Sequence, residues 1–307
     1  MDRLQVLRSM FDASGVGLEI GGSMAPLLSK RDGYRIETLD HASAQDLREK
    51  YKNDPRVDVA RIEDVDFVTD GRSIADTVPR RRFYDYILAS HVVEHMPDLL
   101  GFLQDCALLL KDAGALVLAI PDKRRCFDVF QSTSTTGQVL QAHVEKRTRH
   151  TAGAMFDHCA NHATRNNEIV WVAGSDAPLH LVHDLDFAFW RYRTARDSPD
   201  YHDVHAWHFT PSSWRLIVSD LAYSGDLPLK ETAFADSDGC EFYTSLSRTA
   251  DGCPLDRLTL VTRAIAEQGE VRVGPAADAA APASALEQLE HRVRRLEATC
   301  LPLAAQK

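Results

Sequence analysis

The residues best suited to chemistry begin at a glycine-rich turn near the start of the chain. Glu19 lies in the short strand-like run 17–20, and Gly21 and Gly22 follow that run directly. Small residues in such a turn let backbone N–H groups approach a ligand closely. Asp40 ends the next run about twenty residues later, where a carboxylate can accept hydrogen bonds from ribose hydroxyls. This spacing predicts a site for a nucleotide-like cofactor.

A second group of chemical residues has the spacing of metal ligands. His91, Glu94 and His95 stand at i, i+3 and i+4, so a helix beginning at Val92 would place them on one face, where a divalent ion could bind. Two further histidine pairs, 158/162 and 180/183, lack a third ligand nearby in the sequence. We predict a site without metal ligands, and a divalent ion held by the first three residues is the alternative.

The elements that must position these residues follow a repeating pattern. From residue 16 to about 120, short β-branched or apolar runs alternate with helical patterns, which is typical of βα units in a parallel sheet. The expected strands are 17–20, 34–39, 63–67, 84–89 and 115–120. A helix over about 99–110 should end at Gly114 as a left-handed cap. In such a sheet ligands bind at the carboxyl ends, so Asp40, Asp66 and Ser90 should converge there.

The second half of the chain has a looser pattern. We expect helical pieces at 137–146 and 185–196, and a helix over 211–221 that Thr210 caps and Pro211 opens. Strands at 229–234, 241–246 and 258–263 would close the sheet in antiparallel fashion. Residues 126–210 supply many His, Asp, Asn, Trp and Tyr side chains, which hydrogen-bond hydroxyls and stack on sugar faces.

These elements predict an α/β fold, a doubly wound and mostly parallel sheet. The main domain should cover residues 1–265, with 126–210 as a substrate-capping insertion, and a low-complexity linker should follow over 266–285. Residues 286–307 should form a short amphipathic helix, because apolar residues there step by three and four. That helix would mediate self-association or dock onto a partner, or it is a frayed tail.

Charge and composition exclude several classes of partner. The chain has 307 residues, with 35 Lys and Arg against 45 Asp and Glu, which argues against recognition of nucleic acid through its phosphates. No apolar stretch is long enough to span a bilayer, and no signal peptide is evident. The six cysteines form no C-x-x-C pair, so we expect reduced thiols and a cytoplasmic protein.

The order of these motifs resembles that of class I S-adenosylmethionine-dependent methyltransferases, with a Rossmann-like fold. The matching runs are 19–23, 40–41, 66–67, 83–95 and 108–115. The resemblance implies that the turn holds the methionine moiety, Asp40 the ribose, and Asp66 with Phe67 the adenine, while Ser90 and His91 close over the sulfonium. The implied cofactor residues are therefore Glu19, Gly21, Gly22, Ser23, Asp40, His41, Asp66, Phe67, Ser90 and His91.

The glycine turn departs from the family in two places. Ser23 and Ala25 stand where the family usually has its second and third glycines. The context of Glu19 and Asp40 nevertheless fits methyltransferases better than the G-x-G-x-x-G fingerprint of nicotinamide dehydrogenases.

A narrower resemblance concerns runs 120–124, 156–158, 183–185 and 203–211, which are similar to bacterial methyltransferases associated with glycan assembly. It implies a saccharide or sugar-linked acceptor. The substrate-binding residues that we predict are Asp122, Lys123, Arg124, His158, His183 and His208. The basic residues of this set could also meet a phosphate on a small molecule.

The expected reaction is O-methylation of a sugar hydroxyl with S-adenosylmethionine, giving S-adenosylhomocysteine. The hydroxyl must lose its proton, and we predict His91 and His205 as the candidate catalytic bases. A phosphate, carboxylate or amine acceptor is an alternative. A different class of alternative is a non-catalytic scaffold that binds the cofactor and recruits a glycosyltransferase through the C-terminal helix, which could also form a homo-oligomer.

Overall fold

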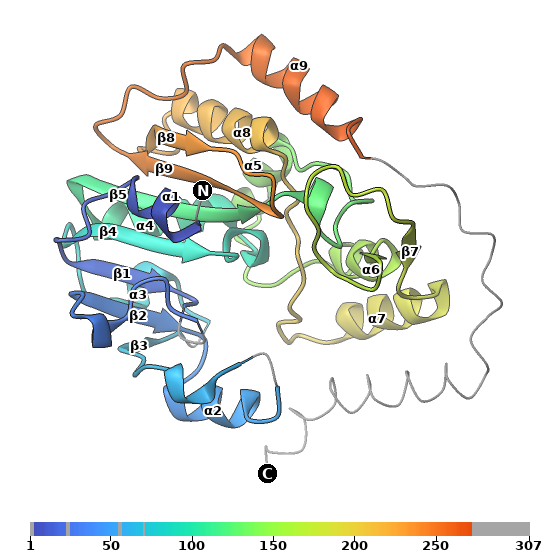
Figure 1. Cartoon of the computed structure of the whole chain (residues 1–307), viewed down its shortest axis with the longest axis horizontal. Coiled ribbons are helices and arrows are strands. Elements are labelled where there is room, and N and C mark those ends of the chain that lie inside the picture. Colours follow the sequence, from blue (N-terminus) through green and yellow to red (C-terminus); the bar gives the residue numbers. More distant parts are fainter. Residues whose placement is uncertain (1–2, 23–24, 55–56, 70, 272–307) are drawn as a thin grey trace.

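The main body of the molecule is built on a seven-stranded sheet (Figure 1). The structure is a computed structural model, and it describes residues 3–22, 25–54, 57–69 and 71–271. Its strands, in spatial order, are β3 (Phe67–Val68), β2 (Ile36–Asp40), β1 (Gly17–Ile20), β4 (Tyr84–Ser90), β5 (Leu110–Pro121), β9 (Glu241–Ser247) and β8 (Lys230–Ala235). The first five run parallel, β9 pairs antiparallel with β5, and β8 pairs antiparallel with β9. The predicted doubly wound α/β fold is confirmed.

Alternation along the strands builds a core on each face of the sheet. Ile87 and Leu118 face the larger core, which includes apolar residues of the helices that cover this face. Tyr86 and Val117 face the other core, which α1 and the chain around Leu28 cover. The helices in this part are α1 (Arg3–Arg8), α2 (Ala44–Tyr51), α3 (Ile74–Thr77), α4 (Leu99–Leu109), α5 (Thr136–Val144) and α8 (Pro211–Ser224).

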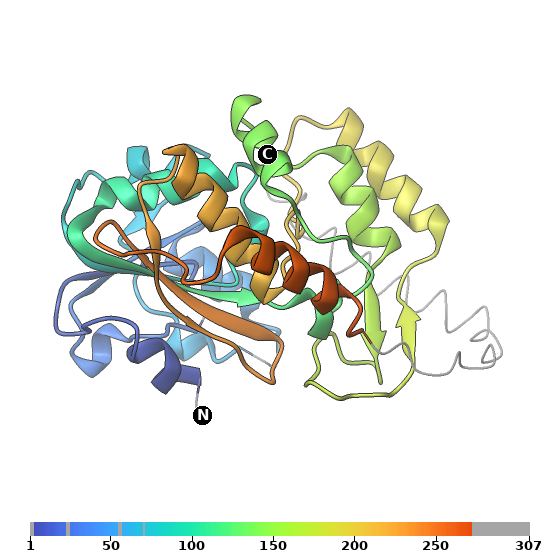
Figure 2. The ribbon, with the colours of Figure 1, turned by 90° about the horizontal axis from the view of Figure 1, so that it is seen from above.

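Residues 126–210 extend from the carboxyl ends of β4 and β5 (Figures 1 and 2). Helix α5 packs into the larger core through Val139 and Ala142. The rest forms a lobe with a small core of its own, which includes Met155 and Ala188. The elements of this lobe are α6 (Ala152–Ala160), β6 (Ala163–Arg165), β7 (Leu179–Leu181) and α7 (Leu185–Asp197).

Several predicted elements form where the sequence indicated them. Helices α5 and α7 overlap the segments 137–146 and 185–196, and α8 begins at Pro211 behind the Thr210 cap. Short 3-10 helices add further turns: η1 (Lys30–Asp32), η2 (Val59–Arg61), η3 (Val93–His95) and η4 (Lys123–Arg125).

Three predictions about elements are wrong. Residues 258–263 belong to helix α9 (Arg257–Gln268), which the Asp256 side chain caps and which buries Leu260 and Ala264, four residues apart. Of the predicted strand 63–67, only Phe67 belongs to β3, which pairs with β2 through Phe67 and Val68. Gly114 lies inside β5 rather than at a helix cap, and a Cβ there would come 2.9 Å from the Tyr84 carbonyl oxygen.

The end of the chain is only partly described. Helix α9 runs to Gln268, so residues 266–268 of the predicted linker are helical. The predicted C-terminal helix at 286–307 lies outside the described residues. Within the described part of the chain, the helices are too short or too polar to cross a membrane.

Candidate functional site

The turn after β1 has the open backbone that a cofactor site needs. Gly21 has a φ of 73°, in the left-handed region, and a Cβ there would come 3.0 Å from Val92 Cγ2. A Cβ on Gly22 would lie 2.2 Å from Glu19 Oε1. The predicted cofactor residue Ser23 lies outside the described residues. The two glycines therefore keep this end of β1 free of side chains.

Glu19 holds the chain that follows the turn. Its carboxyl oxygens accept hydrogen bonds from the backbone N–H groups of Leu27 at 2.7 Å and Leu28 at 3.3 Å. Burial raises the pKa of Glu19, and these hydrogen bonds lower it. Burial is the larger effect, so the pKa is raised to about 7. Glu19 thus shapes the turn from beneath and carries a carboxyl group that is easily protonated.

Asp40 ends β2 beside this turn, as the sequence predicted. Its side chain is 5% exposed, and Oδ1 lies 2.6 Å from His41 Nδ1 and accepts the His41 backbone N–H at 2.7 Å. Lys50 Nζ lies 3.2 Å from the other ring nitrogen of His41. The carboxylate is therefore held in place at the carboxyl end of the strand.

Asp66 and Phe67 lie one strand further along. Asp66 Oδ2 accepts the backbone N–H of Thr38 at 2.7 Å and forms an ion pair with Lys30 at 2.5 Å. Phe67 is partly buried against the larger core. Asp66 therefore precedes β3 and ties its start to β2, so the expectation that it lies at a carboxyl strand end with Asp40 and Ser90 is wrong.

Ser90 and His91 take part in a network at the end of β4. His91 has a φ of 53°, which is unusual for a residue with a side chain, and its Nε2 lies 2.9 Å from Glu241 Oε2. Arg3 contacts both Glu241 Oε1 and Ser90 Oγ at 2.5 Å. Burial lowers the pKa of His91, but the hydrogen bond with Glu241 and the charge of Glu94 outweigh it, so the net pKa is raised.

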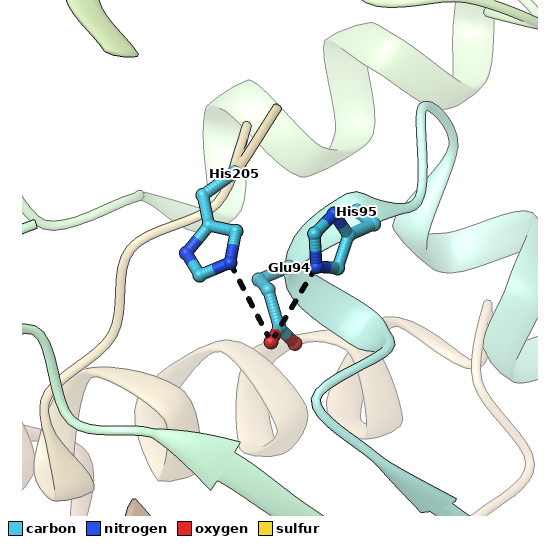
Figure 3. A group of neighbouring side chains, drawn as sticks. All are labelled: Glu94, His95 and His205. Atoms are coloured by element: carbon cyan, nitrogen blue, oxygen red, sulfur yellow. Dashed lines mark ion pairs between the residues drawn. The ribbon is translucent and has the colours of Figure 1, made fainter. Parts of the chain in front are cut away.

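Glu94 is the centre of the next group, which lies just beyond β4. Its side chain is fully buried, and within the described residues neither carboxylate oxygen accepts a hydrogen bond. Oε1 lies 3.9 Å from Nε2 of His95 and 3.9 Å from Nε2 of His205 (Figure 3). We call Glu94, His95 and His205 the Glu94 cluster.

Each imidazole of the Glu94 cluster is oriented by another carboxylate. Asp203 Oδ1 lies 2.8 Å from Nδ1 of His95, and Asp128 Oδ2 lies 2.6 Å from Nδ1 of His205. Burial raises the pKa of Asp128, but the neighbouring histidines outweigh it and lower the pKa to about 2. The carboxylates thus fix both rings with Nε2 directed at Glu94.

The extended segment that carries Asp203 and His205 is fastened to η3. The backbone N–H of Ala206 donates to the Glu94 carbonyl oxygen at 2.8 Å, and the Trp207 indole N–H donates to the Met96 carbonyl oxygen at 2.5 Å. Two distant parts of the sequence therefore meet in the Glu94 cluster.

Two further predicted histidines gather around Asp128. His208 Nε2 lies 3.7 Å from Asp128 Oδ1, and His158 packs near His205 with ring centroids 6.2 Å apart. Burial lowers the pKa of His158 to about 3 and that of His208 to about 4, so both rings are neutral near pH 7. His183 stands further out, stacked on Phe187 at 4.2 Å.

Asp122, Lys123 and Arg124 lie buried at the end of β5. Arg124 forms a bidentate pair with Asp122, with Nη2 2.5 Å from Oδ2, and also pairs with Glu270. Lys123 Nζ donates to the Val129 carbonyl oxygen at 3.1 Å. The charge of Arg124 is thus paired within the protein, whereas Lys123 is held by a backbone carbonyl and burial lowers its pKa.

A cavity of about 650 Å³ opens beside the Glu94 cluster. Its walls include the polar side chains of Gln131, Asp157 and Asn161, together with Trp207 and His208. His208 lines the cavity and lies 3.7 Å from Asp128, so the His208 ring stands between the cavity and the carboxylate that holds His205.

Asp128, Asp203 and Glu241 are among the site residues that the sequence reasoning missed. None of them lies in a glycine turn or at the carboxyl end of a parallel strand, where cofactor residues are expected. The only signal was chemical type: Asp128 is an acidic residue in the histidine-rich insertion, and a buried histidine needs a partner.

Comparison with known proteins places this site in context. The family described as "Methyltransferase domain" matches residues 2–219. This range includes the glycine turn, Asp40 and all members of the Glu94 cluster. No curated protein matches the chain.

Solved structures give distant likenesses. The CcbJ methyltransferase from Streptomyces caelestis is 12% identical, with 80% of this chain and 92% of that chain covered and a TM-score of 0.41. A putative S-adenosylmethionine-dependent methyltransferase from Listeria monocytogenes is also 12% identical, with 79% and 95% covered and a TM-score of 0.38. A putative Zn-dependent alcohol dehydrogenase from Rhodobacter sphaeroides is 14% identical, with 81% and 91% covered and a TM-score of 0.43.

The raised pKa of Glu19 predicts a pH-dependent stability. Because its pKa is about 7 in the folded chain against 4.5 ordinarily, ionisation of Glu19 should weaken the fold as pH rises through this window. The side chain of Glu19→Gln cannot ionise, so only the wild type should lose stability in this window. The free energy of unfolding of the variant minus that of the wild type should therefore increase by ~2–3 kcal/mol between about pH 5 and about pH 8. Urea unfolding at the two pH values measures this. An equal difference at both would show that Glu19 titrates normally.

Proposed function

Since the chain belongs to the methyltransferase domain family, which matches residues 2–219, we propose that it methylates a sugar hydroxyl of a glycan, nucleotide sugar or sugar-bearing metabolite. The methyl donor is S-adenosylmethionine, and the fold is the Rossmann-like sheet of the class I enzymes. The observation that carries the hydroxyl acceptor is the oriented pair of Asp128 and His205 beside a polar cavity.

The residues at the carboxyl ends of β1, β2 and β4 fit the cofactor. When bound, S-adenosylmethionine supplies an electrophilic methyl group on a sulfonium. Gly21 and Gly22 would receive its methionine moiety, because added Cβ atoms would fill the turn. Asp40 would accept the ribose hydroxyls, and Ser90 and His91 would line the sulfonium side. Asp66 and Phe67 stay our candidates for the adenine side.

The acceptor must present its oxygen in line with the methyl group and lose a proton. A protein promotes such a step by holding the two reactants in register and by assisting proton removal. Of the two histidines proposed as catalytic, His205 is the better suited, because Asp128 fixes its Nδ1 while its Nε2 lies 3.9 Å from Glu94 Oε1, too far for a hydrogen bond. His91 is engaged with Glu241, and its raised pKa favours the protonated form.

The cavity beside the Glu94 cluster supports a sugar acceptor. The side chains of Asp157 and Asn161 can hydrogen-bond several hydroxyls, and Phe130, which is 39% exposed, offers an aromatic surface for a sugar ring. We propose that His158 and His208 contact the acceptor from the side of Asp128. His183, further out, could reach only a larger acceptor.

Phosphate acceptors are less well supported. Lys123 and Arg124 are buried and hydrogen-bonded within the protein, and we leave them and Asp122 out of the proposed acceptor site. Arg147, which lines the cavity, is paired with Glu145 at 2.7 Å. The experiments below separate the remaining alternatives. These are a carboxylate or amine acceptor, and a scaffold that recruits a glycosyltransferase through the C-terminal segment.

Asp40→Asn should weaken binding of S-adenosylmethionine at least ~10-fold, because a charged acceptor of ribose hydrogen bonds is lost. Isothermal titration calorimetry with the cofactor measures this. The matched control is Asp112→Asn, which alters an exposed carboxylate near the start of β5, paired with Arg82. Unchanged affinity in Asp40→Asn would remove Asp40 from the cofactor site, and no binding by the wild type would remove the proposed function.

His205→Ala should lower kcat by ~10²–10⁴-fold while the affinity for S-adenosylmethionine is kept, since the side chain acts on the acceptor. Steady-state kinetics with a methylated sugar as product gives kcat, and calorimetry gives the cofactor affinity. His143→Ala is the control, because His143 pairs with Asp98 at 2.9 Å away from the cluster. Full activity in His205→Ala would eliminate His205. Cofactor binding without turnover on any acceptor would favour the scaffold.

A further inference from the structure

We propose that the Glu94 cluster binds a divalent transition-metal ion through Glu94, His95 and His205. The three ligand atoms, a Glu94 carboxylate oxygen and Nε2 of each histidine, all lie within 4.8 Å of one another. Metal–ligand bonds of ~2.0–2.2 Å place ligand atoms ~3.0–3.5 Å apart. The observed separation of 3.9 Å between Glu94 Oε1 and each Nε2 therefore needs only a small contraction.

The state of Glu94 is the first reason. A carboxylate that is fully buried and, among the described residues, accepts no hydrogen bond is costly, and native proteins pair such a charge or use it to coordinate a metal. The histidines around it make ion-pair distances of 3.6–3.9 Å, too long for hydrogen bonds. An ion at the centre of the cluster would give these oxygens the partner that they lack.

The orientation of the histidines is the second, independent reason. A metal-bound imidazole commonly gives its other nitrogen to a carboxylate, which fixes the ring and strengthens the ligand. His95 and His205 both have this arrangement, with Asp203 and Asp128 at Nδ1 and with Nε2 directed at Glu94. The Tyr201 hydroxyl in turn donates to Asp203 at 2.9 Å. Both rings are thus already set in the orientation that ligation requires.

Charge also favours a cation. The cluster and its outer carboxylates contain three acidic groups, Glu94, Asp128 and Asp203, against two imidazoles. Glu94 and Asp128 are buried, whereas Asp203 is exposed. With His95 and His205 neutral, the two buried carboxylates carry a charge of −2, and a protonated His91, 3.6 Å from Glu94 Oε1, would still leave −1. A divalent ion offsets that excess when the rings are neutral ligands.

This ligand set differs from the alternative drawn from sequence spacing. His91 was one of the three residues considered, but its Nε2 is engaged with Glu241, and its Nδ1 stands 3.6 Å from Glu94 Oε1. The site is completed instead by His205, which comes from the far end of the insertion. Sequence spacing could not reveal a ligand that lies 110 residues from His95.

The mixed nitrogen and oxygen donors point to zinc, manganese, cobalt, iron or nickel rather than to calcium or magnesium, which prefer oxygen ligands. With three protein ligands, the ion keeps coordination positions open for an oxygen atom of another molecule. One consequence rests on the proposed function: an acceptor hydroxyl bound to the ion would have a lower pKa and would release its proton to solvent as the methyl group moves from sulfur to oxygen, and His205, with Nε2 on the ion, would then hold the ion in place of accepting the proton.

The test is direct titration of the full chain, dialysed against a chelator, with Co²⁺. We expect one equivalent to bind and to give visible absorption bands of a ligated ion, and Zn²⁺ to displace it. Glu94→Gln and His205→Ala should abolish these bands, whereas His143→Ala should keep them. Asp128→Asn should weaken binding by ~10–100-fold through its hold on His205. Circular dichroism and a cooperative urea transition establish that each variant is folded.

No binding by the folded wild type, or equal binding by folded Glu94→Gln, would overturn the metal site. These results do not depend on the proposed function, because the metal titration uses neither cofactor nor acceptor. The affinity for S-adenosylmethionine is measured separately on the same samples. Metal binding without methyl transfer to sugars would refute the acceptor and leave the metal site supported. Methyl transfer that persists after chelation, together with no metal bound, would refute the metal site and leave the reaction supported.

Discussion

The buried carboxylate of Glu94 is the constraint on which the functional half of the molecule depends. A charge with no hydrogen bond inside a protein is tolerated only when its surroundings compensate for it. Here two imidazoles face it, and each imidazole is held from behind by another carboxylate, Asp203 or Asp128. Removing any one member would leave its neighbours with unmatched charge. The group is therefore a single unit, and its geometry is set before any ligand arrives.

The fold brings this unit together from two sources. Strand β4 and the short helix η3 supply Glu94 and His95 at the edge of the sheet where ligands of parallel α/β proteins bind. The insertion supplies His205 on an extended segment, which the hydrogen bond from Ala206 to the Glu94 carbonyl fastens in register. Strand β9 adds Glu241, which holds His91 beside the glycine turn. The proposed cofactor side and the proposed acceptor side thus meet at the end of β4.

Much of the fold was predictable because it depends on local signals. Alternating runs and glycine turns indicated the parallel strands, and the Thr210 cap indicated α8. Residues 258–263 were misassigned because their apolar and β-branched side chains suit a strand, whereas the helical signals, the Asp256 cap and the spacing of Leu260 and Ala264, lie partly outside that run. The partners of the site residues could not be predicted, since Asp128 and Glu241 reach their histidines through tertiary contacts. Sequence named most of the histidines of the site, and the structure supplied the carboxylates that orient them.

The central claim is that this methyltransferase acts on a sugar hydroxyl activated beside His205. The most direct measurement is mass spectrometry of products formed with S-adenosylmethionine whose methyl group is deuterated. Candidate glycans and nucleotide sugars would be incubated alongside amines, carboxylates and phosphates of similar size. The account predicts that one labelled methyl group appears on a sugar oxygen, and that it disappears with His205→Ala. Label found only on an amine, a carboxylate or a phosphate would contradict it.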